Sequence, residues 1–459
     1  MVKKRLKIRP LLVTLNILVL LIIVGFYTFR LVKYYKKENG KKENSVILLV
    51  DEIVKKQSFV DLTKGLVYDE KENVYRYIGD VKDNYLEFSG NLFRIIEVDA
   101  DYNIKAVSEK SFTYMYSGLE KGFNDSYLNE WLNELDSDNS GVFERNMYNT
   151  DPLFYTTVCE DVISDVANIT CDKKNKENRI GILSLYEYAK SGGKSGFLNN
   201  GEIFYLTNLN DKGSNYYVTS DGEISISELT TKAFGVRPVI TISGDTSLLS
   251  GKGTINNPYR IEKHEIQKVK DLYIGNIITI DDLNYVVVDV SGENVKVALN
   301  DTLKTKDDDT LLKAFGGNNS IYSNNKNTVG HYLNNDFYNS LSNKEIIAKS
   351  DWYIGKLSLD KLDYSGVYSS KVALNVGMLT LGDMFINDVK NVFTLFRGIE
   401  DNKIIYVINE DGNFYGDFIS SKYEVRPAFY IKGDTLINGG AGTEDEPYEL
   451  GDSNEETES

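Results

Sequence analysis

The chain has 459 residues and a formal net charge of −16 at pH 7, with 26% charged and 41% hydrophobic residues. Its length leaves room for more than one ordinary domain, each with its own apolar core. So acidic a chain repels the phosphates of nucleic acids, which excludes a nucleic-acid partner.

An uncharged apolar segment at residues 11–29 is the first feature along the chain. As a helix it would span roughly 28 Å, close to the hydrocarbon thickness of a bilayer. It is longer than the apolar part of a cleavable signal peptide, and no small-residue cleavage site follows it. The sequence therefore predicts a transmembrane helix that stays attached as a signal anchor, between a basic tail at 1–10 and a juxtamembrane stalk at 30–65.

Basic residues flank this segment on both sides, so the positive-inside rule does not decide its orientation. The short N-terminal tail is easily retained, and large C-terminal domains translocate largely regardless of their charge. We expect a single-pass protein of the cell membrane, N-in and C-out, with extracellular C-terminal domains.

Two distant segments of the chain carry the same phrase. AFGVRPVITISGD contains Arg237, and KYEVRPAFYIKGD contains Arg426, 189 positions later. Further matches follow in the same order, such as GTINNPYRI with GTEDEPYEL and YYVTSDG with YVINEDG. A fixed order at nearly one offset is typical of a duplicated domain. We predict a first domain at 66–262, a charged linker at 263–270, a second domain at 271–450 and an acidic disordered tail at 451–459.

Alternating apolar residues predict strands in both copies. The segment 85–98 favours a hairpin that turns at Ser89-Gly90, and the second copy offers 283–299 with a turn at Ser291-Gly292. Three later strands are expected in each copy, IFYLT, NYYVT and VITI in the first and VFTLF, IIYVI and AFYI in the second.

Helical spacing appears between these groups of strands. Leu128, Trp131, Leu132 and Leu135 predict a helix after a capping segment, and a second helix is expected from Ser184. The matching helices of the second copy run through Tyr332 and from Thr380. The predicted fold class is therefore α+β, with mainly antiparallel sheets and inserted helices in two homologous domains.

The repeat-equivalent residues are the candidate structural motif. They combine an aromatic residue on the first helix, an Asp-Gly turn and an Arg-Pro pair at a strand start. In the first copy they are Trp131, Asp221, Gly222, Arg237 and Pro238; in the second they are Tyr332, Asp411, Gly412, Arg426 and Pro427. A recurring arginine fits a ligand contact, and it equally fits a buried salt bridge that orders the last strand.

The two cysteines, Cys159 and Cys171, both lie in the first copy. Outside the cytoplasm they could form a small disulfide loop, and two unpaired thiols are the alternative. Since the second copy has no cysteine, such a bond is a local constraint and not a requirement of the fold.

The order NYLEFSGNLFRIIEV, WLN, YYVTSDG and GVRPV resembles an uncharacterised bacterial extracellular domain of low-GC Gram-positive bacteria. The resemblance covers both copies, although Glu424 replaces the first glycine of GVRPV in the second. That family is distantly similar to the C-type-lectin-like fold of the formylglycine-generating enzymes. The resemblance implies a possible lectin-like fold, and a fold alone does not give a function.

The residues offer little for catalysis. His264 and His331 are the two histidines of the chain, and neither recurs in the other copy. No catalytic residue, metal ligand or cofactor-binding residue is predicted, and no cofactor is expected.

Three classes of function stay open. The first is a surface-exposed, non-catalytic binding protein, adhesin-like, that recognises an extracellular glycan or protein. The 32 tyrosines favour it, because tyrosine stacks on sugar rings, although an AT-rich genome explains the same composition. The second is a structural or assembly partner of envelope machinery, and the third is an enzyme acting on cell-wall polymers.

Overall fold

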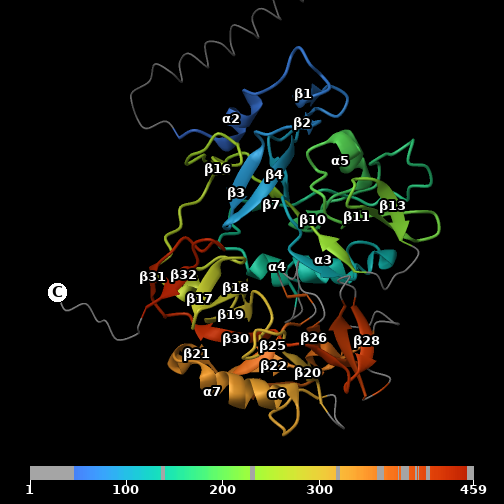
Figure 1. The fold of residues 1–459 in the computed structure, drawn as a ribbon. Helices are drawn as coiled ribbons and strands as arrows, with labels where there is room; N and C mark the ends of the chain where they lie inside the picture. The colour runs from blue at the N-terminus through green and yellow to red at the C-terminus, as the bar shows by residue number, and fades with distance from the viewer. Residues whose placement is uncertain are drawn as a thin grey trace, which may run out of the picture. The chain divides into compact units, whose positions relative to one another are not determined.

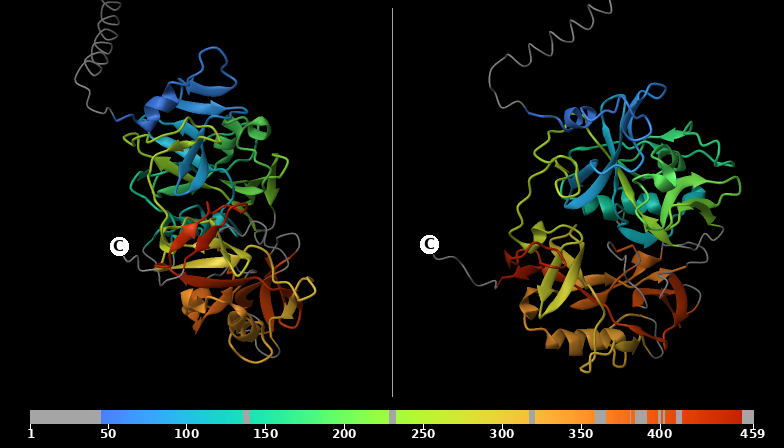
Figure 2. Two further views of the ribbon diagram at one scale, coloured as in Figure 1. Left: turned by 60° about the vertical axis from the view of Figure 1, so that its left-hand side comes forward. Right: turned by 45° about the horizontal axis from the view of Figure 1, so that its top comes forward.

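The computed structural model describes residues 46–135, 140–227, 233–316, 321–358, 366–380, 382–383, 392–398, 401, 403–409 and 414–451. The chain divides at Leu48, and the compact unit that begins there contains all the strands described below. We call its residues up to 262 the first half and those from 263 the second half. Figures 1 and 2 show their strands in blue to green and in yellow to red.

Strands dominate the fold. They make up 38% of the structure against 13% for helices, so the predicted α+β class is wrong and the fold is mainly β. The predicted helices that fall within the described residues are short, and most of the one expected from Thr380 lies outside the described residues. The helix through Trp131 ends at Leu132, and Leu135 is 38% exposed instead of continuing the apolar face. The helical spacing in the sequence therefore corresponds to a short connecting helix and not to a layer of helices.

The first half contains a nine-stranded sheet in the order β1-β2-β4-β5-β15-β10, with β3 on β4, β16 on β3 and β7 on β15. Its strands are β1 (Gly65–Asp69), β2 (Val74–Ile78), β3 (Tyr85–Phe88), β4 (Asn91–Val98), β5 (Ile104–Ser108), β7 (Leu153–Phe154), β10 (Ile180–Ile182), β15 (Pro238–Ile242) and β16 (Tyr259–Arg260). A five-stranded sheet has the order β13-β12-β11-β14-β6. Its strands are β6 (Thr113–Met115), β11 (Phe204–Leu209), β12 (Asn215–Val218), β13 (Ile224–Ser227) and β14 (Phe234–Val236).

The second half pairs its strands in the same way. The run β17-β18-β19-β30 has the order of β3-β4-β5-β15, and β28-β27-β26-β29-β20 has the order of β13-β12-β11-β14-β6. The strands are β17 (Ile277–Ile280), β18 (Leu283–Asp289), β19 (Asn294–Leu299), β20 (Leu312–Ala314), β21 (Ile347–Ala348), β23 (Lys356–Leu357), β25 (Val376–Met378), β26 (Val392–Gly398), β27 (Ile404–Ile408), β28 (Phe414–Phe418), β29 (Lys422–Glu424), β30 (Pro427–Lys432), β31 (Ile437–Gly439) and β32 (Tyr448–Leu450). Even the parallel pairs recur, β16 on β3 as β32 on β17, and β11 on β14 as β26 on β29.

Six later strands confirm the sequence interpretation, namely β11, β12 and β15 and their counterparts β26, β27 and β30. The hairpin predicted at 283–299 is confirmed, because β18 and β19 pair antiparallel on either side of Ser291-Gly292. It is not the counterpart of the hairpin at Ser89-Gly90, which matches the turn between β17 and β18. Ser89 and Gly90 have positive φ angles, and the matching pair between β17 and β18 is Asp281 and Asp282, also with positive φ. Two successive residues with positive φ match the right-handed twist of the paired strands. Aspartate adopts positive φ more readily than most residues other than glycine, so it can occupy such a turn. Ser291-Gly292 instead lies between β18 and β19.

Short helices connect the strands. Those of the first half are α2 (Leu49–Val54), η1 (Leu119–Lys121), α3 (Tyr127–Leu132), α4 (Val142–Arg145), α5 (Leu185–Lys190) and η2 (Gly193–Ser195). Those of the second half are η3 (Val269–Asp271), α6 (Val329–Tyr332), the π-helical turn η4 (Leu333–Phe337), α7 (Tyr338–Ser340), η5 (Lys344–Ile346) and η6 (Val367–Ser369). Although α2 falls in the predicted stalk, it buries Leu49, Val50 and Ile53 in the core.

The prediction of a single-pass membrane protein is corrected by the structure. Among the residues that it describes, no helix is both long enough and apolar enough to cross a membrane. The segment on which the prediction depends, 11–29, lies outside the described residues, as do the tail 1–10 and the stalk up to residue 45.

Candidate functional site

The two repeated arginines are buried and bind backbone oxygens. Arg237 donates from Nε to the oxygen of Ser108 at 2.9 Å and from Nη1 to that of Leu198 at 2.7 Å. Arg426 donates from Nε to the oxygen of Leu299, which ends β19 as Ser108 ends β5. The predicted salt bridge is absent for Arg237, which has no carboxylate within 4 Å among the described ion pairs. Arg237 joins the end of β5 to the start of its neighbour in the sheet, β15. Arg426 joins the end of β19 to the start of β30 in the same way.

Arg237 is 1% exposed, and its environment is costly for a charge. Burial lowers the pKa of its guanidinium to about 10, although Glu109 and Glu202 oppose this shift. The ring of Phe204 lies 4.7 Å from the guanidinium carbon, and Nη2 has no hydrogen-bond partner in the described structure. This arrangement is a structural clamp, because the buried guanidinium binds backbone oxygens of two separate segments.

The helices that carry Trp131 and Tyr332 are attached to the sheets by an asparagine in each half. Asn133 donates to the oxygen of Ile180 and accepts from its N–H, at 2.8 and 2.9 Å. Asn334 makes the same two bonds to Val376 at 2.8 and 3.0 Å. The triplets WLN and YLN are thus equivalent because their last residue fixes a helix to the strand β10 or β25.

The other predicted residues are placed at turns and strand starts. Asp221 is exposed, and Gly222 has φ +83° in the turn between β12 and β13. Pro238 and Pro427 are the first residues of β15 and β30, where a missing N–H disturbs the ladder least. Asp411 and Gly412 lie outside the described residues.

Each half also buries a lysine–carboxylate pair that sequence reasoning missed. Lys105 on β5 pairs with Glu187 on α5, and Lys296 on β19 pairs with Asp383 at 2.8 Å. The carboxylates also accept the N–H of Ser184 and Thr380, which closes the first turn after each residue. The lysines hold equivalent places opposite Thr241 and Tyr430. The sequence feature that could have predicted these pairs is a lysine within an apolar strand segment in both copies.

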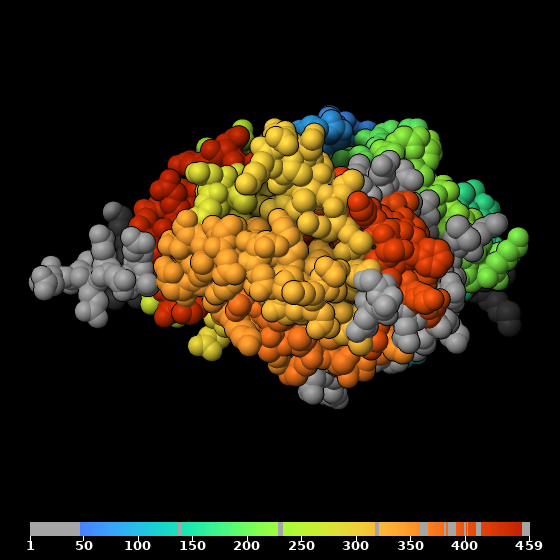
Figure 3. Space-filling model, turned by 60° about the horizontal axis from the view of Figure 1, so that its bottom comes forward, coloured from blue at the N-terminus to red at the C-terminus, as the bar shows by residue number. Residues whose placement is uncertain are grey.

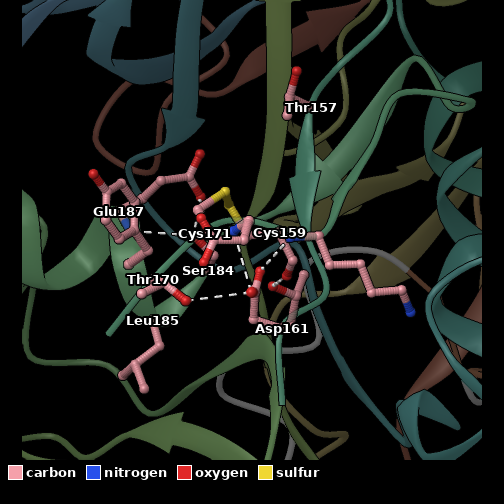
Figure 4. Close-up of a disulfide and its surroundings, with 12 residues drawn as sticks. Thr157, Cys159, Asp161, Thr170, Cys171, Ser184, Leu185 and Glu187 are labelled. Atoms are coloured by element: carbon pink, nitrogen blue, oxygen red, sulfur yellow. Dashed lines mark hydrogen bonds between the residues drawn. A yellow bond between two sulfur atoms is a disulfide. The ribbon is translucent and has the colours of Figure 1, made fainter. Parts of the chain in front are cut away.

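Cys159 and Cys171 form a disulfide, shown in Figure 4. The bond closes the ribbon of β8 (Val158–Cys159) and β9 (Lys174–Asn175). Within the loop, Asp161 accepts bonds from the N–H groups of Asp172 and Lys173 at 3.1 and 3.0 Å. The second half has a ribbon of β22 (Ser350–Tyr353) and β24 (Lys371–Leu374) at this point of the chain, without cysteines.

A pocket of about 550 Å³ in the second half is the candidate binding site. It lies where β19 begins and β30 ends, next to β21 and η3. Its lining is Lys270, Glu293, Asn294, Ile347, Ala348, Lys349, Lys432, Gly433 and Asp434. We call Lys270, Lys349 and Lys432, which are all exposed, the lysine triad. Among the described ion pairs none involves these three ammonium groups, so their charge is available to a ligand.

The equivalent position in the first half has different chemistry. Lys349 and Lys432 correspond to Tyr155 and Ser243, since β7 and β21 share one register against β15 and β30. Phe154 and Tyr155 are 41% and 51% exposed, with ring centres 6.2 Å apart. The same edge of the sheet is therefore cationic in the second half and aromatic in the first.

The described residues contain no group of three or more His, Cys, Asp or Glu side chains that would hold a metal ion. His264 packs against Tyr148 and Tyr273, with ring centres 3.8 and 4.9 Å away. His331 contacts Asn324 and Asn335 on the surface of α6. His264 also forms a hydrogen bond with the backbone oxygen of Asp271. Among the interactions described, neither histidine contacts a carboxylate or a cysteine side chain.

Comparison with known proteins gave no relative: no family model, no curated protein and no solved structure matches the chain. The likeness to a lectin-like fold stays a prediction. Function is therefore argued from the geometry of the residues alone.

Proposed function

We propose that this chain is a non-catalytic binding protein whose second half binds an acidic ligand in the lysine pocket. The observation that carries the proposal is the lysine triad around a pocket of about 550 Å³ in a protein of net charge −16. Local positive charge on an acidic surface attracts an anion selectively, since the rest of the molecule repels it. The volume is that of a small-molecule site.

The ligand class we propose is an acidic saccharide. Carboxylate or phosphate groups would contact the ammonium groups of Lys349 and Lys432. Glu293 and Asp434, which share the rim, would accept bonds from sugar hydroxyls. The exposed rings of Phe154 and Tyr155 in the first half supply a stacking surface of the type that sugar rings use. We further propose that the chain works in an oxidising compartment, because such compartments preserve a disulfide like Cys159–Cys171.

Isothermal titration of the full chain with galacturonic acid oligomers tests this proposal, with neutral galactose oligomers for comparison. We expect binding of the acidic oligomers that weakens with salt. The double variant Lys349→Ala/Lys432→Ala should lose at least about tenfold in affinity, equivalent to about 1.4 kcal/mol. The matched control, Lys212→Ala, removes an exposed lysine outside the pocket and should bind as the native chain does.

Two results would refute the proposal. One is equal affinity of the double variant and the native chain for acidic oligomers. The other is binding that Lys212→Ala weakens as much, which would show a diffuse charge effect. If inorganic phosphate binds and saccharides do not, the pocket binds anions and the saccharide assignment is wrong.

A second candidate function, an assembly partner, is favoured by a different observation. Tyr332 on α6 is partly exposed, whereas its equivalent Trp131 is 5% exposed, and Leu312 on the neighbouring β20 is 47% exposed. The equivalent face of the first half, around Trp131, is covered by the second half, because the indole N–H of Trp131 donates to the oxygen of Gly382.

A further inference from the structure

The hairpin of β1 and β2 is an addition found only in the first half. The two halves begin alike, since the N–H of Leu49 bonds to Thr246 and that of Val269 to Thr435. The first half then inserts the hairpin before β3, whereas the second half leads directly from η3 to β17. The shared fold therefore does not require the hairpin.

The hairpin covers the end of β4 and the start of α5. Arg76 on β2 is 4% exposed and binds Glu97 on β4 through Nη2 at 2.8 Å. It also pairs with Glu72, and its guanidinium lies 5.6 Å from the ring centre of Tyr186. The Tyr186 hydroxyl in turn donates to Glu72. Arg76 thus joins the hairpin to both elements.

The same two places in the second half are covered by the first half. Asp289 matches Glu97, because each lies opposite the buried lysine of the next strand. The N–H of the following residue, Val290, donates to Asn146. Gly382 matches Tyr186, because each precedes the buried carboxylate. Its oxygen accepts a bond of 2.8 Å from the indole N–H of Trp131.

Trp131 and Asn146 belong to the helical face of the first half, around α3 and α4. That face contacts a different surface of the second half, so the contact is head-to-tail. In the first half the β1–β2 hairpin occupies the position that a preceding repeat would occupy. Stacked repeats commonly carry a terminal cap of this kind, with a polar outer surface.

The helical face of the second half has no such cover among the described residues. Tyr332, the equivalent of Trp131, is partly exposed and has Lys313 over its ring at 4.4 Å. Trp131 by contrast is 5% exposed. Figure 3 views this side of the molecule, where atoms of the 329–345 region form part of the surface.

We propose that the face formed by α6, η4, α7 and β20 is a docking surface for a second copy of this chain, and that the β1–β2 hairpin is the cap that prevents this docking. The occupant is a copy whose hairpin has been displaced, because only then are the surfaces next to Glu97 and Tyr186 open. Continuity with the contact between the halves gives the geometry. Such a head-to-tail contact extends to chains of several copies.

Sedimentation velocity of the full chain over a range of concentrations tests this proposal. Arg76→Glu places a negative charge against Glu72 and Glu97 and should release the hairpin. We expect the variant to form oligomers whose size grows with concentration while the native chain does not. Lys82→Glu, the same charge reversal at an exposed position, should behave as the native chain.

A second variant separates docking from misfolding. Arg76→Glu/Tyr332→Asp has an open first half and a blocked second half, so it should be monomeric alone and should form a 1:1 complex with the native chain that grows no further. The proposal is overturned if Arg76→Glu stays monomeric, or if Tyr332→Asp leaves its oligomers unchanged. A mixture that gives no 1:1 complex also overturns it. These outcomes are independent of saccharide binding.

Discussion

At the scale of single residues, the fold concentrates its buried charge at equivalent positions. Lys105 and Glu187 are 7% and 5% exposed, and Lys296 and Asp383 are 5% and 11% exposed. A buried ion pair recovers its desolvation cost only when both partners are present and hydrogen-bonded. Each pair links a central strand to the turn that follows Ser184 or Thr380, so it specifies how the strand and the turn meet.

Removing one partner of such a pair should destabilise the protein strongly. We expect Lys105→Met to lower the free energy of unfolding by about 3–5 kcal/mol, because Glu187 is left buried without its counter-charge. Lys105→Met/Glu187→Gln keeps the acceptor for the N–H of Ser184 and removes the charge, so it should recover part of the loss. Urea denaturation of the full chain measures both. Equal losses in the two variants would contradict this explanation.

Glu262 should make stability depend on pH. Burial raises the pKa of this carboxyl to about 7 from its ordinary 4.5, with Glu87 adding to the shift and the N–H of Ser89 opposing it. The folded state therefore binds a proton that the unfolded state releases, and stability falls as pH rises from about 4.5 to 7. The side chain is partly exposed, so we expect an effect on the order of 1 kcal/mol.

Urea denaturation at pH 5 and pH 8 tests this dependence. Glu262→Gln should be less sensitive to pH than the native chain. Glu265→Gln changes an exposed neighbour and serves as the control. If the native chain and Glu262→Gln show the same change between the two pH values, another group causes the dependence.

At the scale of elements, the two halves achieve the same connection by different means. The ribbon β8–β9 is closed by a disulfide, whereas β22–β24 is held by four register pairs and the ion pair of Lys371 with Asp351 at 2.6 Å. The bond is therefore a local addition to the short ribbon. Closing a loop of 12 residues reduces the freedom of the unfolded chain.

We expect Cys159→Ser/Cys171→Ser to lower the free energy of unfolding by about 3 kcal/mol and to keep the fold. Urea denaturation with and without a reductant measures this difference. Reductant should destabilise the native chain by the same amount and leave the double variant unchanged. Loss of the native circular dichroism spectrum in the variant would show that the bond is required for folding.

At the scale of the whole molecule, one strand order occurs twice with different surfaces. The shared parts are buried: the arginine clamp, the asparagine bond between helix and strand, and the lysine–carboxylate pair. The differing parts are the β1–β2 hairpin, the disulfide ribbon, and the edge that is aromatic in one half and cationic in the other. The repeated residues therefore maintain the architecture, and the proposed lysine pocket lies among the residues that differ.

The sequence by itself determined the repeated phrases, six of the later strands and the equivalence of WLN with YLN, because alternation and motif order are local properties of a chain. It missed the mainly β class, since a short helical pattern does not reveal its own length. It correctly predicted the hairpin at 283–299 but did not reveal the tight turn at Asp281-Asp282, because that pair lacks the glycine that marks most such turns.

Only the tertiary structure decided the rest. The partners of Lys105 and Arg76 lie 82 and 21 positions away, and the lysine triad comes from three separate segments. Distances between such residues depend on how strands pair across the sheet, and no local pattern records that pairing. Burial decides which charges are structural and which remain available to a ligand, and burial exists only in the folded chain.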